Sequence, residues 1–209
     1  MKLDISTPFA YYIADGVLDF DFTDIRNDKR ITYQETVDVK DMKSYHYKYF
    51  RVLESYPSLR DALTDRFNLF LQHTFGNIES KISTSWLTNL RDGDRITRHT
   101  HANCFYSGIL YFGKNYDDTT ARLTLENPLA NQLHTIIPQY YRAHNSHHPT
   151  LDNIALTPVT GGFHFFPAHI AHYSTVHTGE DRQSLAFNFV INSNIYCKDS
   201  TQFHHEITN

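Results

Sequence analysis

Apolar residues follow two different spacings along the chain, and each spacing predicts a different kind of element. Downstream of Pro57 they recur every three or four residues, at Leu59, Leu63, Phe67, Phe70 and Leu71. This spacing predicts an amphipathic helix whose apolar face lies against a sheet. The helical pattern extends from 41 to 76. We expect it to break at Pro57, where Ser58 to Asp61 form a candidate capping box, and to stop at Gly76.

After Ser80 the pattern changes to short alternating runs separated by turn residues, which is typical of β-strands. The runs are KISTSWLTNL, HANCFYSGILYF, ARLTLEN, NIALTPV, FHFFP, HYSTVHT and SLAFNFVIN. Several short strands in succession predict a sandwich or a barrel. Roughly the first 35 residues indicate one or two further strands. The long irregular segment 128–152, rich in tyrosine and histidine, is expected to border a binding site.

Composition narrows the class of protein. With 209 residues and 40% hydrophobic content, the chain is expected to form a single domain. Within it we distinguish N-terminal strands and supporting helices (1–80), a β core (81–195) and a C-terminal tail (196–209). A formal net charge of −4 argues against a nucleic-acid binder. Because no apolar run reaches the length of a membrane span and the start lacks the features of a signal peptide, we expect a cytoplasmic protein without a membrane partner. A homodimer is left open.

Histidine is the compositional anomaly, with 14 residues in the chain. In a strand, side chains two positions apart share a face, so His99 and His101 are expected to point the same way, with Asn103 next on that face. Two imidazoles can then converge on one metal ion. A His-x-His pair alone also arises by chance in a chain so rich in histidine. A third ligand would have to come from a distant strand, and His172 is the candidate.

A possible anion site follows His172. A hairpin through the turn HTGED would place His172 opposite Ala186, with Arg182, Ser184 and Asn188 on the same small, polar face. A buried arginine needs an anionic partner, and its planar fork fits a carboxylate, with Ser184 as an extra donor. Metal ligands at one end and a carboxylate clamp at the other describe a site for a small diacid. The opposite face of this strand suits packing beneath the helix and carries Leu185, Phe187, Phe189 and Ile191.

The order of these residues resembles the iron(II)/2-oxoglutarate oxygenases that carry a His-x-His variant motif. The resemblance extends from about Ser85 to Asn192 and rests on Ser85, Trp86, Asn89, Gly93, Asp94, His99, His101, Asn103, Ser107, Gly108, Tyr111, Phe166, Pro167, His172, Arg182, Ser184 and Asn188. It implies a mainly β (α+β) fold, the double-stranded β-helix or jelly roll, with the N-terminal helices packed on the outer sheet. It also implies that Fe(II) is held by the first motif and the later histidine, and that Arg182 holds the distal carboxylate of 2-oxoglutarate.

The resemblance further implies a dioxygenase that uses O₂ and 2-oxoglutarate, releases succinate and CO₂, and hydroxylates a substrate that the family does not identify. Ser184 and Asn89 are further candidate contacts to the cosubstrate, whereas Trp86 is expected in the core. One position departs from the usual triad, whose carboxylate stands two residues after the first histidine, because His101 occupies it. Either His99, His101 and His172 form a three-histidine site or another residue replaces the carboxylate. Anionic 2-oxoglutarate would partly offset the missing negative charge.

Two alternatives belong to other classes. The spacing Gly93-x5-His99-x-His101 also matches the opening of the cupin motif, and cupins hold metals on the same barrel without 2-oxoglutarate, some with three histidines. The glutamate expected four or five residues later is replaced by Phe105 and Tyr106, which together with Arg182 favours the oxygenase. The other alternative is a non-catalytic jelly-roll module in which the histidines are incidental. The metal content of the purified protein would separate that module from the two enzymes.

Overall fold

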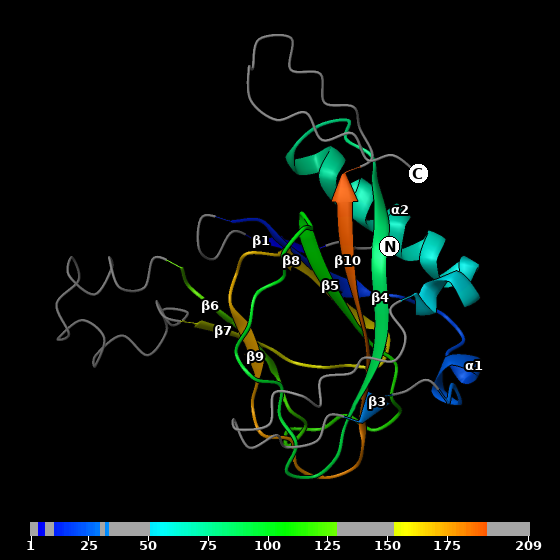
Figure 1. Cartoon of the computed structure of the whole chain (residues 1–209), viewed down its shortest axis with the longest axis vertical. Helices are drawn as coiled ribbons and strands as arrows, with labels where there is room; N and C mark the ends of the chain where they lie inside the picture. Colours follow the sequence, from blue (N-terminus) through cyan, green and yellow to red (C-terminus); the bar gives the residue numbers. More distant parts are fainter. Residues whose placement is uncertain (1–3, 7–10, 30–31, 34–50, 129–152, 192–209) are drawn as a thin grey trace, which may run out of the picture.

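The computed structural model of the chain describes residues 4–6, 11–29, 32–33, 51–128 and 153–191. In this part, two β-sheets pack against each other and a long helix lies on the outside of the larger sheet (Figure 1). The expectations for residues 41–50, for nearly all of the segment 128–152 and for the tail 196–209 concern residues outside the described part.

A seven-stranded sheet forms the larger layer. In spatial order its strands are β1 (Asp4–Ser6), β2 (Ile13–Val17), β8 (Gly162–Pro167), β5 (Tyr106–Tyr111), β10 (Arg182–Ile191), β4 (Ser80–Leu90) and β3 (Thr32–Tyr33). Neighbouring strands are antiparallel except β3 and β4, which are parallel. The long strand β10 lies between β4 and β5, so its side chains meet groups from both neighbours.

The smaller sheet contains β7 (Asn153–Leu156), β6 (Leu123–Glu126) and β9 (His172–Ser174), in that order. A β-bridge between His99 and His172 adds the segment that follows β4 to the edge of this sheet. From β4 onward the chain therefore passes repeatedly between the larger and the smaller sheet and returns to the larger one at β5, β8 and β10. This alternation is the double-stranded β-helix, so the predicted mainly β fold class is confirmed.

The long helix is α2 (Pro57–Thr74), and its apolar face covers the outer face of the larger sheet (Figure 1). Its buried residues are the five that the spacing predicted: Leu59, Leu63, Phe67, Phe70 and Leu71. The ring of Phe67 stacks on that of Phe189 from β10, with 3.9 Å between the ring centroids. Two short helices, α1 (Thr23–Arg26) and η2 (Val52–Ser55), precede α2. The prediction of an N-terminal helix packed on the outer sheet is confirmed.

The two ends of α2 differ in how well the sequence predicted them. The capping box from Ser58 to Asp61 was wrong, because the N-cap residue is Tyr56 and it makes no side-chain capping bond. Pro57 begins the helix, since its fixed φ and missing N–H suit a first helical position. Gly76 has a φ of +93° just past the helix, so the predicted stop is confirmed.

The predicted hairpin between His172 and β10 does not form. His172 lies in the smaller sheet, whereas Ala186 lies in the larger sheet opposite Trp86 of β4 and Ile109 of β5. The turn between β9 and β10 therefore carries the chain from one sheet to the other. A short turn between two alternating runs predicts a hairpin from local sequence, but here longer-range pairing decides the partners.

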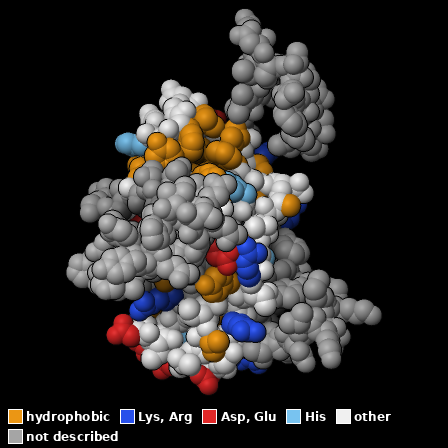
Figure 2. Space-filling model, turned by 90° about the vertical axis from the view of Figure 1, so that its left-hand side faces the viewer, with side chains coloured by type: hydrophobic (Ala, Val, Ile, Leu, Met, Phe, Trp, Pro, Cys, Tyr) orange, Lys and Arg blue, Asp and Glu red, His pale blue; other side chains and the backbone are white. Residues whose placement is uncertain are grey.

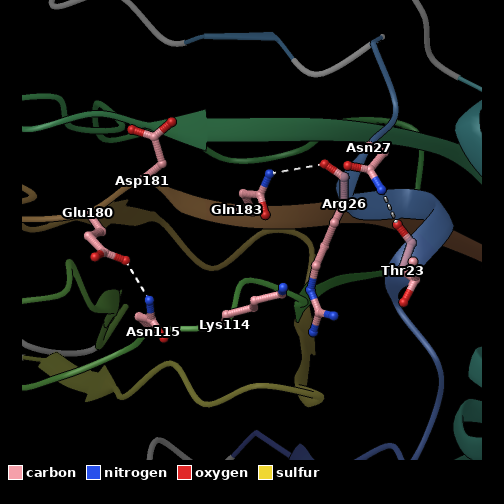
Figure 3. Close-up of a pocket in the computed structure, with 8 residues that line it drawn as sticks. All are labelled: Thr23, Arg26, Asn27, Lys114, Asn115, Glu180, Asp181 and Gln183. Atoms are coloured by element: carbon pink, nitrogen blue, oxygen red, sulfur yellow. Dashed lines mark hydrogen bonds between the residues drawn. The ribbon is translucent and has the colours of Figure 1, made fainter.

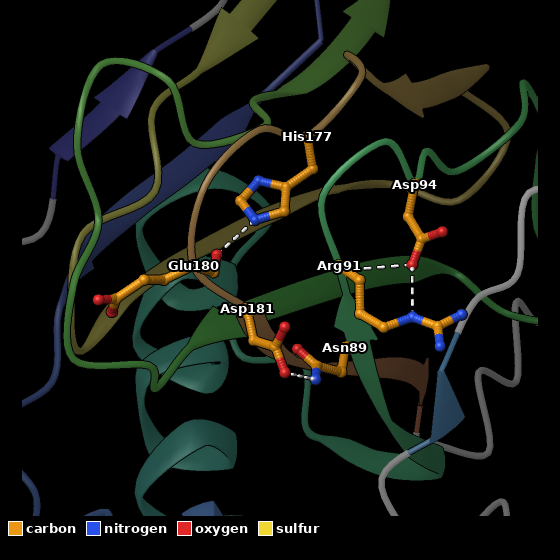
Figure 4. A network of polar contacts seen from close by, with 6 residues as sticks. All are labelled: Asn89, Arg91, Asp94, His177, Glu180 and Asp181. Atoms are coloured by element: carbon orange, nitrogen blue, oxygen red, sulfur yellow. Dashed lines mark hydrogen bonds and ion pairs between the residues drawn. The ribbon is translucent and has the colours of Figure 1, made fainter.

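The turn before β10 is held by the loop that follows β4. The backbone N–H of His177 donates to the carbonyl of Asp94, and the N–H of Gly93 donates to the carbonyl of His177. Side chains reinforce the same region: Asp94 accepts the backbone N–H of Arg91 and lies 3.5 Å from its Nε (Figure 4). The imidazole of His177 is buried and contacts the carbonyl of Glu180. These contacts fix where β10 begins, and hence the position of its first residue.

The surface combines apolar and charged groups. Figure 2 shows apolar side chains gathered on the upper part of one face, with lysine, arginine and acidic side chains scattered over its lower part. Among the described residues, no helix is both long and apolar enough to cross a membrane.

Candidate functional site

Three histidines meet between the two sheets. The backbones of His99 and His172 exchange hydrogen bonds of 3.0 and 2.9 Å, and the N–H of His101 donates to the carbonyl of Ala168. The ring centroid of His99 lies 5.1 Å from that of His101 and 4.2 Å from that of His172, and the centroids of His101 and His172 are 4.9 Å apart. One nitrogen from each ring lies within 4.8 Å of the others. The structure therefore brings together the three histidines that the sequence singled out.

Hydrogen bonds set the orientation of each imidazole. The Nδ1 atom of His99 contacts the carbonyl of Thr97 at 2.8 Å, and that of His172 contacts the carbonyl of Ile170 at 2.9 Å. Because a carbonyl oxygen only accepts, both Nδ1 atoms carry the proton and both Nε2 atoms keep a free lone pair. In these two rings, the atom that remains available to a cation is Nε2.

The third ring, His101, is oriented by side chains. Its Nδ1 lies 2.6 Å from Oδ1 of Asn188 and 2.7 Å from the hydroxyl of Ser107. With Nδ1 donating to Asn188, its Nε2 is also unprotonated, and this atom lies 3.1 Å from Nε2 of His99. Two lone pairs this close repel each other unless a cation lies between them, so the donor set fits a metal ion. Among the described residues, no carboxylate joins the three histidines of this cluster.

Burial keeps the cluster neutral. It lowers the pKa of His99 and of His101, and it lowers the pKa of His172 to about 3, with a further contribution from the two neighbouring histidines. Neutral imidazole is the form that binds a metal. At neutral pH, none of these rings needs to lose a proton before it can act as a ligand.

Arg182 is the first residue of β10 and is completely buried. Its Nη2 donates to the hydroxyl of Tyr111 at 3.0 Å, and its guanidinium carbon lies 4.9 Å from the centroid of the same ring. The other two nitrogens, Nε and Nη1, have no hydrogen-bond partner among the described residues. A buried guanidinium without an anion is costly, and N–H groups that lack a partner can donate to a carboxylate.

Strand register places Arg182 on the same face as the histidine cluster. Side chains at every second residue of β10 point the same way, so Arg182, Ser184 and Asn188 share a face, and Asn188 contacts His101. The opposite face contributes Leu185, Phe187 and Phe189 to the core beneath α2. The predicted division of this strand into a polar and an apolar face is confirmed.

Asn89 does not belong to this face. Arg182 pairs with Leu90, and therefore Asn89 points to the other side of β4, together with its partner Gln183. Its amide donates to Asp181 at 2.7 Å (Figure 4). Asn89, a candidate contact to the cosubstrate, therefore faces away from Arg182, and this direction follows from the register with β10, which local sequence does not give.

Trp86 also differs from expectation, and the two tyrosines at the ends of β5 lie on opposite faces of the sheet. Trp86 is only half-buried, and its ring centroid lies 5.6 Å from that of His101, so it borders the histidine cluster instead of the core. Tyr111 contacts Arg182, while Tyr106 lies on the outer face against Phe67. The sequence missed the pairing of Tyr111 with Arg182, and only the alternation along β5 could have separated the two tyrosines.

A polar pocket of about 400 Å³ lies near the start of β10 but outside this site. Its lining residues are Thr23, Arg26, Asn27, Lys114, Asn115, Glu180, Asp181 and Gln183 (Figure 3). Gln183 points away from Arg182 because adjacent residues of a strand face opposite sides. The pocket is therefore separated from the histidine cluster by the larger sheet.

Acid should destabilise the folded chain through its buried histidines. Burial lowers the pKa of His164 to about 4, against about 6.5 in an unfolded chain. Between these values the unfolded chain binds the proton more readily, so stability falls as the pH drops from 6.5 toward 4, by up to about 3 kcal/mol for this residue. Urea unfolding at pH 7.5 and 4.5 should show a smaller loss for His164→Leu than for the wild type. Equal losses would contradict a buried, neutral His164.

The chain matches one family model over residues 84–188, half of its length, and that family is described as "Putative 2OG-Fe(II) oxygenase". No curated protein sequence matches the chain.

Among solved structures, an oxidoreductase of the 2OG-Fe(II) oxygenase family from Burkholderia pseudomallei is similar at 14% identity and a TM-score of 0.47, over 90% of this chain and 72% of that one. A Pseudomonas putida prolyl-4-hydroxylase is similar at 15% identity and a TM-score of 0.45, over 63% of each chain. HygX from Streptomyces hygroscopicus with iron bound is similar at 12% identity and a TM-score of 0.45, over 68% of this chain and 70% of that one. With TM-scores below 0.5, these likenesses carry no weight beside the family match.

Proposed function

The chain belongs to the family of 2OG-Fe(II) oxygenases, which are oxidoreductases, and on that premise we propose that it is an Fe(II)- and 2-oxoglutarate-dependent dioxygenase that hydroxylates a C–H bond of its substrate. In the balanced reaction, O₂ supplies one oxygen atom to the new hydroxyl group and the other to succinate, while 2-oxoglutarate also releases CO₂. The family match supports the oxygenase class, and the described residues support the roles assigned below.

In this proposal His99, His101 and His172 hold Fe(II) through their Nε2 atoms. The convergence of three unprotonated nitrogens supports the assignment, as do the Nδ1 hydrogen bonds that fix each ring. The iron supplies the redox chemistry that couples O₂ and 2-oxoglutarate to oxidation of the substrate. The protein positions the reactants and shelters the cavity.

Arg182 binds the distal carboxylate of 2-oxoglutarate, and its buried, half-satisfied guanidinium is the observation that carries the proposal. A diacid with a keto acid at one end can bind the metal there and present its other carboxylate to Arg182. Charge supports the same choice: three neutral imidazoles, Fe²⁺ and one arginine give +3, and the dianion reduces this to +1. Ser184 lies two residues from Arg182 on the same face and is a second candidate donor.

A cupin-type metal enzyme is the alternative, because a site of three histidines without a carboxylate also fits that class. The two differ in their need for 2-oxoglutarate. The test is an anaerobic titration of the Fe(II)-loaded protein with 2-oxoglutarate, followed by metal-to-ligand charge-transfer absorbance and, after air is admitted, by succinate release. We expect both signals. An iron-loaded protein that shows neither at millimolar 2-oxoglutarate would favour the cupin.

Asn188 is expected to act as a positioning residue for His101. Asn188→Leu removes the acceptor of the His101 Nδ1 proton, so the ring loses its fixed orientation and Fe(II) binding should weaken about 10- to 100-fold. Asn188→Asp keeps an acceptor and should retain most of the affinity. Anaerobic Fe(II) titration of both variants checks this, and unchanged binding by Asn188→Leu would contradict it.

A further inference from the structure

His164 is a second buried polar group on the inner face of the larger sheet. It belongs to β8, opposite Ile109 of β5, and Ile109 in turn lies opposite Ala186 of β10. Because cross-strand partners point to the same side, His164 faces the interior with the polar side of β10. Its neighbours Phe163 and Phe165 point the other way, into the core beneath α2. The side chain of His164 is only 9% exposed.

Neither ring nitrogen of His164 has a hydrogen-bond partner among the described residues. The backbone of Thr157 raises the pKa of His164 and opposes the effect of burial, but its contact with the ring does not have the geometry of a hydrogen bond. Asp15 stands opposite His164 in β2 and does not bond to it either. A buried imidazole without a partner costs free energy that bonding to a ligand would recover.

The surroundings of His164 include Arg182, where an acceptor of the His164 N–H would also contact the guanidinium. The centroid of the His164 ring lies 5.9 Å from that of Tyr111, the same tyrosine that contacts Arg182. The charge of Arg182 also helps to lower the pKa of His164, after the larger effect of burial, so the two groups lie within electrostatic reach of each other. Four buried nitrogens, two on each residue, are therefore unpartnered around one tyrosine.

We propose that His164 donates a second hydrogen bond to the distal carboxylate of 2-oxoglutarate, beside Arg182, and thereby selects dicarboxylic over monocarboxylic keto acids. This inference rests on the proposed function. A carboxylate offers about four acceptor positions, and a bidentate contact with an arginine occupies two of them, so a further donor can be accommodated. A neutral imidazole always has one N–H to give.

The test compares two ligands and three variants. The ligands are 2-oxoglutarate and 2-oxopentanoate, which has the same chain length but lacks the distal carboxylate. His164→Leu removes the donor at similar volume, His164→Gln keeps an N–H donor, and Ile109→Val is a packing control in the neighbouring strand. Each Fe(II)-loaded protein is titrated anaerobically, and the melting temperature of each is measured without ligand.

His164→Leu is expected to bind 2-oxoglutarate about tenfold more weakly, the usual effect of losing a hydrogen bond to a charged group, and to bind 2-oxopentanoate as the wild type does. His164→Gln should recover most of the difference, and Ile109→Val should change neither ligand. Without ligand, His164→Leu should melt at a higher temperature, because an unpaired buried polar group has been removed. A purely structural role would produce the opposite shift in melting temperature.

Failure of this inference can be distinguished from failure of the proposed function. If the wild type binds 2-oxoglutarate and His164→Leu binds it equally well, or loses both ligands equally, the role of His164 is overturned while the oxygenase proposal stands. If the wild type does not bind 2-oxoglutarate, both are overturned. His164→Met provides a second apolar variant if His164→Leu does not fold, with the same expected result.

Discussion

Replacing Arg182 with alanine is expected to weaken 2-oxoglutarate binding by roughly 30-fold or more, while Fe(II) binding changes little. A charge-assisted bidentate pair in a sheltered site is worth on the order of 2–5 kcal/mol on truncation, and each 1.4 kcal/mol corresponds to about tenfold in affinity. Part of this loss is the cost of leaving the cosubstrate carboxylate unpaired. The measurement is an anaerobic titration of the iron-loaded protein by calorimetry or charge-transfer absorbance.

Two further variants sharpen this result. Arg182→Lys should recover only part of the affinity, because lysine keeps the charge but loses the planar fork that contacts both oxygens. Arg60→Ala is the matched control, since Arg60 lies on α2 with its side chain 41% exposed and pairs there with Asp61. Equal binding of 2-oxoglutarate by Arg182→Ala and the wild type would place the carboxylate clamp elsewhere.

Replacing His99, His101 or His172 singly with alanine should reduce Fe(II) affinity more than any other change proposed here. Each change removes one of three converging nitrogens, so Fe(II) affinity should fall by well over the roughly 100-fold that the loss of an outer hydrogen-bond partner can cost. The check is the amount of iron bound anaerobically by each variant. His73→Ala, on the exposed surface of α2, is the control.

The His101 variant is the most informative of the three, because this residue occupies the position of the usual carboxylate. If His101→Ala binds iron as tightly as the wild type, His101 is not a ligand and the variant motif has been misread. A three-histidine site would be supported if all three variants lose iron binding while their melting temperatures show that they remain folded.

Elements with a long, regular pattern were predictable from the sequence. The apolar spacing of α2 and the alternation of β10 each reflect burial of one face, so the residues themselves record which side is covered. The ends of elements were less predictable. The sequence predicts a break at Pro57 and a capping box after it, whereas Pro57 is the first residue of the helix and the N-cap residue Tyr56 makes no side-chain capping bond.

Strand partners were the main failure. The turn HTGED follows His172 and suggests a hairpin, yet β9 and β10 lie in different sheets because β10 pairs with β4 and β5. The same long-range register turns Asn89 away from the site. Successive side chains along a strand point to opposite faces of the sheet. Which of the two faces a given residue occupies therefore depends on strand pairing, and a local sequence pattern does not contain that information.

The candidate site shows the same division. His99, His101, His172 and Arg182 could be proposed because their residue types are rare in strand interiors and their order resembles a family. The acceptors that orient the rings could not be proposed in this way, because Asn188 contacts His101 from a strand 87 positions further along the sequence. His164 is buried, neither of its ring nitrogens has a hydrogen-bond partner among the described residues, and no sequence pattern singles it out.

The central claim is that one cavity holds Fe(II) at the three histidines and 2-oxoglutarate between the metal and Arg182. It is tested most directly by a crystal structure of the protein grown anaerobically with Fe(II) and 2-oxoglutarate. We expect the metal on the Nε2 atoms of His99, His101 and His172, with the distal carboxylate of 2-oxoglutarate against the guanidinium of Arg182. A metal bound by other residues, or a carboxylate that does not reach Arg182, would contradict the claim.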